Sequence, residues 1–230
     1  GEGQLVFFVE HEAFAAASAV VDTAYENIIH HKLLVMRPDY LLAVDILRAT
    51  DGAEHTFDWM YHNRGEAIVS ESAPVEGDAP EGQGFEFIDT IRRGETDEAI
   101  RATVTNGAGN VHLVMNDSAN SEILIGTGVG ESVLDRVPLL YVTRKGTSAS
   151  FGATIEPTSG DAEPEVSAVH VKESDLGEFV ITVLMNGGQE ELFSYDPEGR
   201  TRKLAGVETS EKLLVVRRGK SEGVEVLGTS

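Results

Sequence analysis

The sequence predicts an all-β protein folded as an antiparallel β-sandwich, and three observations support this fold class. Short apolar stretches recur at a spacing of roughly 8–12 residues, which is typical of sandwiches. Gly, Pro, Asp and Asn separate these stretches, and helix signals are few. Hydrophobic residues make up 41% of the 230-residue chain, which is enough for a substantial core.

The expected strands are distributed along the whole chain. The first covers residues 5–9. Residues 14–24 are ambiguous, because their alanines favour a helix whereas a Val-Val pair and weak helical periodicity oppose it. Later strands are expected at residues 85–92, 99–105, 110–116, 122–126, 138–145, 148–156, 166–172, 178–186, 190–195, 200–204 and 212–218.

Two polar stretches interrupt this pattern. Residues 157–164 are rich in Pro and Gly and divide the chain into residues 1–157 and 158–230. Two interpretations stay open for the second part: it continues the sandwich, or it forms a smaller C-terminal β-subdomain. Residues 71–84 contain no expected strand, and long loops of this kind often bind ligands.

Composition limits the classes of partner. The net charge is −21, and such a field opposes binding to nucleic acid or to anionic membranes. An anionic partner would need a locally basic pocket.

The sequence has no cysteine, which excludes disulfides, thiol catalysis and thiolate metal sites. No transmembrane segment or signal peptide is evident. Because the chain begins directly in a strand, we expect a piece of a longer protein. We expect that protein to be bacterial and either secreted or periplasmic.

Three consecutive strands, at residues 26–37, 40–50 and 55–64, are the most informative part of the sequence. A turn at Pro38-Asp39 pairs the first two and places Lys32 opposite Asp45. A second turn, at Asp51-Gly52, is expected to pair the second and third strands as a hairpin. One face of this sheet is then a core face, with Ile29, Leu33, Val35, Leu42, Val44, Ile46, Phe57, Trp59 and Tyr61.

The opposite face carries His30, Lys32, Asp45 and His62 within neighbouring or diagonal reach. Three interpretations are open. In the first, the face is solvated and holds a weak Lys32–Asp45 pair. In the second, it faces a polysaccharide and its cations bind carboxylates or sulfates. In the third, His30, Asp45 and His62 bind zinc. We predict carbohydrate binding by these four residues, and no metal.

Other motifs favour ordinary structure. Residues 126–130 are rich in glycine, but no helix follows them, so a flexible loop is favoured over a nucleotide-binding loop. The oxygen-rich residues 116–122 lack calcium-loop spacing and predict a turn. Arg144 is expected at a solvated hairpin end. Trp59 is expected in the core and not as a platform for sugar.

Two blocks of sequence resemble the β-sandwich of heparinase II/III-type polysaccharide lyases, a group that includes alginate and oligoalginate lyases. The first block is Tyr25-x4-His30-His31-Lys32-Leu33-Leu34-Val35, Arg37-Pro38-Asp39-Tyr40-Leu41-Leu42-Ala43-Val44-Asp45 and Asp51-Gly52-x2-His55-Thr56-Phe57-Asp58-Trp59-x2-His62. The second is Gly126-Thr127-Gly128-Val129-Gly130, Val137-Pro138-Leu139-Leu140-Tyr141-Val142-x-Arg144-Lys145-Gly146 and Ala149-Ser150-Phe151 through Glu156-Pro157. The resemblance spans residues 8–157. It implies an acidic polysaccharide or oligosaccharide as partner, and an α/α-toroid catalytic domain in the full-length protein.

The chain departs from the family where catalysis is concerned. Catalytic Tyr, Asn and His in the family come largely from the toroid, and no such segment is present. His11 is the only histidine before Tyr25, and its context does not match the family's motifs. Tyr61 and His62 lie on opposite faces of a regular strand, so they cannot act together.

We therefore expect a carbohydrate-binding or scaffold module of a lyase acting on a uronate polymer such as alginate. We assign it no catalytic residues and no cofactor. Two alternatives are a catalytically active lyase that works by β-elimination, and a purely structural domain.

Overall fold

The computed structural model describes residues 3–82, 84–132, 134–160, 162–173, 178–219 and 223–230. The protein is all-β and antiparallel, which confirms the predicted fold class. Within the described residues the helical structure is one 3₁₀ turn, η1 (Phe85–Phe87), and no helix has the length and hydropathy to cross a membrane.

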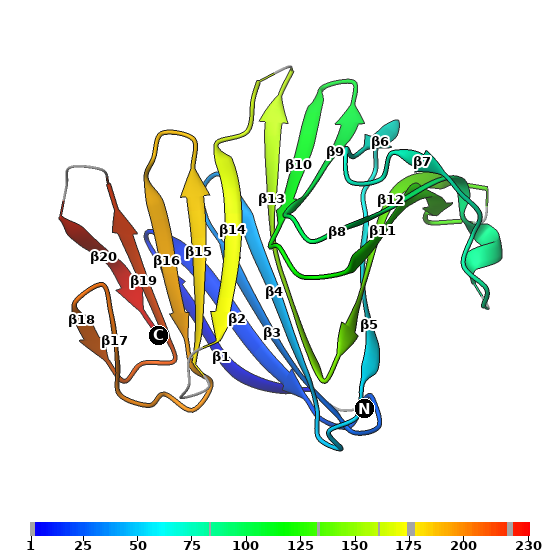
Figure 1. Ribbon diagram of the computed structural model, residues 1–230. Coiled ribbons are helices and arrows are strands. Elements are labelled where there is room, and N and C mark those ends of the chain that lie inside the picture. Colours follow the sequence, from blue (N-terminus) through cyan, green and yellow to red (C-terminus); the bar gives the residue numbers. More distant parts are fainter. Residues whose placement is uncertain (1–2, 83, 133, 161, 174–177, 220–222) are drawn as a thin grey trace.

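Three sheets form successive layers (Figure 1). Sheet A, in the middle, has the order β1 (Gln4–His11), β2 (Phe14–Val21), β3 (Ile28–Met36), β4 (Leu41–Ala49), β13 (Ser148–Ser159), β10 (Gly109–Met115), β9 (Ile100–Asn106), β6 (Ala67–Val69). Sheet B has the order β5 (His55–His62), β12 (Arg136–Gly146), β11 (Ser121–Val129), β8 (Asp89–Thr96), β7 (Val75–Glu76). Sheet C has the order β14 (Val166–Glu173), β15 (Phe179–Met185), β16 (Glu190–Tyr195), β19 (Leu213–Arg218), β20 (Val224–Thr229). A separate hairpin joins β17 (Arg202–Leu204) and β18 (Val207–Thr209).

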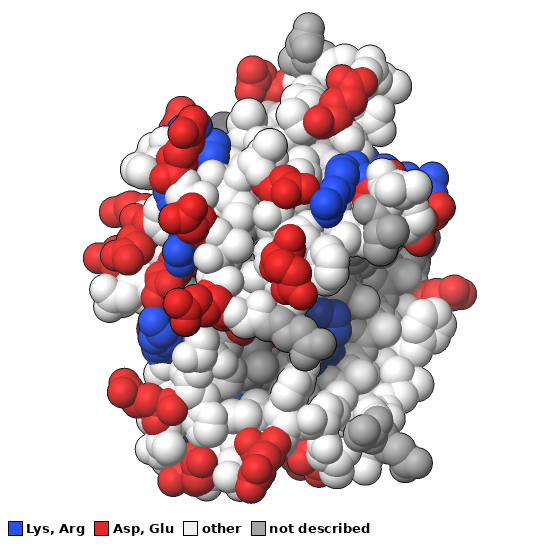
Figure 2. All heavy atoms as spheres, turned by 90° about the vertical axis from the view of Figure 1, so that its right-hand side faces the viewer, with Lys and Arg blue, Asp and Glu red and all other residues white. Residues whose placement is uncertain are grey.

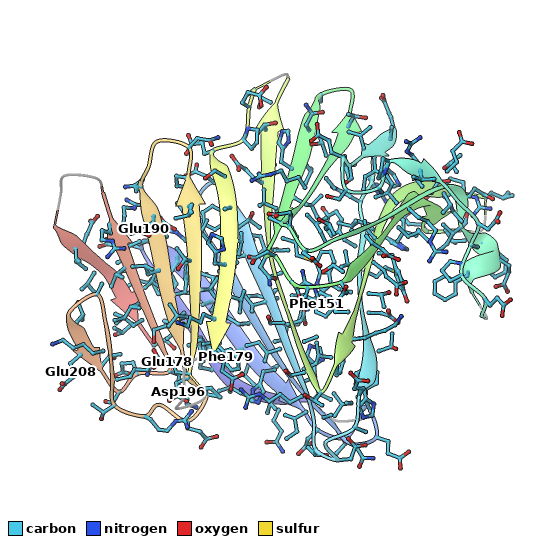
Figure 3. All side chains as sticks on the ribbon, viewed as in Figure 1. Phe151, Glu178, Phe179, Glu190, Asp196 and Glu208 are labelled. Atoms are coloured by element: carbon cyan, nitrogen blue, oxygen red, sulfur yellow. The ribbon has the colours of Figure 1, made fainter. Side chains whose placement is uncertain are left out.

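Sheet A separates two hydrophobic cores, because successive side chains of a strand point to opposite faces. Leu33 of β3 and Val44 of β4 pack against sheet C, where Phe179 is buried. Phe151 of β13 lies in the other core, between sheets A and B, together with Trp59 of β5. Figure 3 places Phe179 on sheet C and Phe151 between the other two sheets. The division of the chain at residue 157 stays a prediction.

The ambiguous segment after the first strand is the strand β2. Its first six residues alternate between buried and half-buried positions, and it pairs with both β1 and β3. Tertiary pairing on both edges overrides the helix propensity of its alanines.

The predicted register between β3 and β4 is confirmed, since Lys32 pairs with Asp45. The turn is closed by a hydrogen bond from the Arg37 amide to the Tyr40 carbonyl, 2.8 Å long.

The predicted hairpin between β4 and β5 is wrong. β4 pairs with β13, and β5 crosses to sheet B to pair with β12. The amide of Ala49 donates to the Thr147 carbonyl, and that of Thr50 donates to the Asn27 carbonyl. These bonds hold the end of β4 within sheet A, so the Asp51-Gly52 turn carries the chain to another layer.

Glycines 126 and 128 lie within β11, so the predicted flexible loop at residues 126–130 is wrong for most of its length. A Cβ at Gly126 would lie 2.7 Å from the Asp89 carbonyl oxygen. Glycine therefore permits the close approach of β8, where the register shifts after Ile125.

Four short or terminal strands were not predicted: β6, β7, β18 and β20. Part of the expected strand at residues 85–92 is η1.

Arg144 is buried, so its predicted exposure at a hairpin end is wrong. Its guanidinium donates to Ser121 Oγ at 3.0 Å, to Asn116 Oδ1 at 3.2 Å and to the Asn116 carbonyl at 2.6 Å. Burial lowers the pKa of Arg144 to about 10. The predicted turn that begins at Asn116 is confirmed, and it supplies acceptors to this buried charge.

A second buried charge cluster joins sheet C to the β3–β4 turn. Arg37 donates to both carboxylate oxygens of Glu191, at 2.6 and 2.8 Å. Tyr40 and Arg217 donate to the same carboxylate. Arg37 and Glu191 are both buried, so this contact is shielded from water and fixes the position of one sheet on the other.

Candidate functional site

The predicted polar face of β3 and β4 contains one assembled cluster, centred on the Asp45 carboxylate. Asp45 is 4% exposed. His30 Nε2 lies 2.7 Å from Asp45 Oδ1, and Lys32 Nζ lies 2.8 and 2.9 Å from the two carboxylate oxygens. The indole Nε1 of Trp59 donates to Asp45 Oδ2 at 3.2 Å. We refer to His30, Lys32, Asp45 and Trp59 as the Asp45 cluster.

The donors keep Asp45 ionised. Burial alone would raise the pKa of Asp45, but the hydrogen bond from His30 and the charge of Lys32 outweigh burial, so this pKa lies below its ordinary value. A carboxylate only accepts hydrogen bonds, so His30 carries a proton on Nε2. No partner for His30 Nδ1 is found in the described part of the chain.

The cluster has a buried floor and an accessible rim. Asp45 and Trp59 form the floor. The Lys32 side chain is 46% exposed and that of His30 is 21% exposed. Lys32 uses one or two of its three N–H groups on Asp45, so it retains a donor for a ligand. His30 presents Nδ1, which accepts a hydrogen bond when the ring is neutral and donates when it is protonated.

His62 does not belong to this cluster, which corrects the predicted proximity of the four residues. Its strand lies in sheet B, where His62 pairs with Leu139 of β12. The imidazole lies beside Gly128, on the outer face of sheet B. Trp59 points from the same strand towards Asp45. A hairpin between β4 and β5 would bring His62 to Asp45, but β4 pairs with β13 and β5 pairs with β12.

Trp59 was predicted in the core, and its 8% exposure confirms this. Its contact with Asp45 was not predicted, because the expected hairpin put the two residues on opposite faces. One signal in the sequence was available: a buried indole N–H usually requires an acceptor. The chain has a single tryptophan, and Asp45 is the one carboxylate of β4, with apolar residues on both sides.

Neither a metal site nor a Tyr–His pair is assembled around the cluster. Among the described residues, no group of three or more His, Asp or Glu side chains is arranged to hold a metal ion. Tyr61 stacks on Trp59 with ring centroids 6.1 Å apart, on the face of β5 opposite to His62. The predicted placement of Tyr61 and His62 on opposite faces of the strand is therefore confirmed.

The sequence matches no protein-family model and no curated protein. Solved structures do match in fold. A mutant of the heparan sulfate lyase HepC from Pedobacter heparinus superposes with a TM-score of 0.58 and 14% identity, over 86% of this chain. A second structure of HepC from the same organism matches with a TM-score of 0.56, 14% identity and 83% coverage of this chain. A heparinase III with methylated lysines matches with a TM-score of 0.55, 14% identity and 85% coverage.

These matches establish a heparinase-like fold. The chain spans only 27–28% of the length of these proteins, so the similarity covers one part of each of them. The similarity is to heparan sulfate lyases and a heparinase III; the alginate type stays a prediction.

Proposed function

We propose that this chain is a non-catalytic β domain of a polysaccharide lyase, and that the rim of the Asp45 cluster contacts an acidic glycan. The fold shared with heparan sulfate lyases over 86% of the chain carries this proposal. In the intact protein, an α/α-toroid domain would supply the catalytic groups, and a secreted or periplasmic location would give access to the polymer. Heparan sulfate and alginate are the two glycans to compare.

The local chemistry suits an anionic group despite the net charge of −21. Lys32 offers an N–H to a carboxylate or sulfate, and His30 adds a second donor when it is protonated. Asp45 lies beneath these side chains at 4% exposure, and the charge of Lys32, which bonds to both of its oxygens, offsets the negative charge of the carboxylate. The buried carboxylate therefore positions the two donors.

Isothermal titration of the whole chain with heparan sulfate and alginate oligosaccharides tests this function. We expect saturable binding of at least one of them. The double variant His30→Ala/Lys32→Ala should weaken it at least tenfold, about 1.4 kcal/mol. The matched control is His170→Ala/Lys172→Ala, which removes the same His-x-Lys pair from exposed positions of β14 and should leave the affinity unchanged.

Two results would contradict the binding role. One is the absence of binding by both acidic glycans; the other is an equal loss in the two double variants. A purely structural domain would be favoured by two results together. The chain would bind neither glycan, and a partner protein would cover this face of sheet A.

One observation favours a second candidate, an autonomous lyase. A buried carboxylate fixes His30 with its other ring nitrogen unoccupied in the described residues, as expected for a general base. Lys32 lies beside it and could neutralise a uronate carboxylate. An ultraviolet assay for the unsaturated uronate product decides this alternative: product that disappears in His30→Ala would establish it, and no product would exclude it.

A further inference from the structure

A hollow lies on the outer face of sheet B, on the side of β5 opposite to Trp59 and Asp45. The hollow has a volume of about 250 Å³. Its walls come from β5, β8, β11 and β12, and from the segment that leads into η1. Figure 2 looks onto this side of the molecule, where the surface is hollowed and acidic side chains outnumber basic ones.

One wall of this hollow is apolar and aromatic. Leu124 and Tyr141 are buried and form its base, and Phe85 packs against them. The Phe85 and Tyr141 rings are perpendicular, with centroids 5.4 Å apart. Phe85 remains partly exposed at the opening. The C–H groups of a sugar ring pack favourably on an aromatic surface of this kind, because the positive C–H dipoles meet the negative π face.

The opposite wall offers hydrogen-bonding groups. Thr143 Oγ1 donates to Asp58 Oδ1 at 2.7 Å. Burial raises the pKa of Tyr141, and the hydrogen bond of its hydroxyl to Asp58 raises that pKa further, so the phenol stays neutral. Asp58 is exposed, and no ion pair to it is found in the described residues. Its carboxylate can therefore accept hydrogen bonds from two neighbouring hydroxyl groups of a ligand.

The rim of the hollow carries charges that largely compensate each other. Lys145 Nζ lies 2.6 Å from Glu122 Oε1, and Arg93 Nη2 lies 3.9 Å from Glu122 Oε2. The remaining acids, Asp58 and Glu81, repel an anionic ligand, whereas Arg93 and Lys145 repel a cationic one.

We propose that this hollow is a binding site for a single neutral sugar ring. A volume of 250 Å³ is smaller than the roughly 300–1,000 Å³ of pockets for drug-sized ligands, which suits one ring. Phe85 supplies the surface on which the ring packs, Asp58 accepts from its hydroxyls, and Lys145 donates to them. The site does not depend on the proposed acidic-glycan function.

An NMR titration of the whole chain tests this proposal. The probes are methyl glucoside and N-acetylglucosamine, with glucuronic acid as the anionic counterpart. We expect saturable shifts of amides in β5, β11 and β12 with at least one neutral probe, in the millimolar range, and weaker binding of glucuronic acid. Phe85→Ala and Asp58→Ala should each weaken the binding of the neutral probe at least tenfold. Asp58→Asn, which keeps one acceptor, should weaken it less than Asp58→Ala does.

Two controls separate this site from other effects. Phe87→Ala alters an exposed phenylalanine of the same 3₁₀ turn that does not line the hollow, and it should leave binding unchanged. His30→Ala/Lys32→Ala should also leave the binding of the neutral probes unchanged. A failure of the acidic-glycan proposal can therefore be told apart from a failure of this one. Absence of shifts with both neutral probes, equal affinity in Phe85→Ala, or tighter binding of glucuronic acid would overturn the proposal.

Discussion

Replacing Glu191 with alanine is expected to lower the free energy of unfolding by about 3–5 kcal/mol. The substitution would leave Arg37, which is 5% exposed, as a buried charge without its carboxylate partner. It would also remove the acceptor of the Tyr40 hydroxyl and of the Arg217 guanidinium. Because these groups connect sheet C to the β3–β4 turn, the loss should appear in the cooperative unfolding of both sheets.

Urea denaturation measures this loss. The control is Arg64→Ala, which breaks an ion pair with Glu131 whose side chains are 75% and 77% exposed. Exposed pairs contribute about 0–1 kcal/mol, so the control should be nearly neutral. Similar losses in the two variants would show that the buried cluster does not stabilise the fold.

The same cluster predicts a dependence on pH. Burial alone would raise the pKa of Glu191, but hydrogen bonds from Arg37, Tyr40 and Arg217 lower it below the ordinary value of 4.5. A carboxyl group whose pKa is lower in the folded than in the unfolded state stabilises the fold at pH values above its unfolded-state pKa. This stability is lost as the pH falls through the folded-state pKa. Acidification below pH 4.5 should therefore destabilise the wild type more than Glu191→Ala.

The second large effect is expected for Asp45→Ala, at about 2–3 kcal/mol. The variant leaves the Trp59 indole N–H buried without its acceptor and removes the partner of His30 and Lys32. The loss should be smaller than for Glu191, because Lys32 is 46% exposed and can be solvated.

Urea denaturation monitored by the fluorescence of Trp59, the single tryptophan, measures the loss in Asp45→Ala. The matched control is Asp89→Ala, since Asp89 is 57% exposed and pairs with the exposed side chain of Arg136. A loss no larger than in the control would contradict the structural role of Asp45.

The part of the site that could be predicted from sequence is the part that local chemistry determines. Proline at position 38 specifies a tight turn, and the two-residue period of the strands then places Lys32 opposite Asp45. Trp59 and Phe57 could be predicted as buried, since their alternation with polar residues marks one apolar face.

The rest depended on pairings that are distant in sequence. The Asp51-Gly52 turn is equally compatible with a hairpin and with a crossing between layers. The choice depends on β13, which occupies the edge of β4 from residue 148 onward. Arg144 could not be identified as buried because its acceptors, such as Asn116, come from other segments and are uncharged.

The Trp59 indole N–H reports on ligand binding at the Asp45 cluster, because it bonds to Asp45 and the chain has a single tryptophan. In a ¹⁵N NMR titration with an acidic oligosaccharide of heparan sulfate or alginate, we predict a saturable shift of this signal. The shift should be lost in His30→Ala/Lys32→Ala and retained in His170→Ala/Lys172→Ala. An unchanged indole signal at saturating oligosaccharide would contradict glycan binding at the Asp45 cluster.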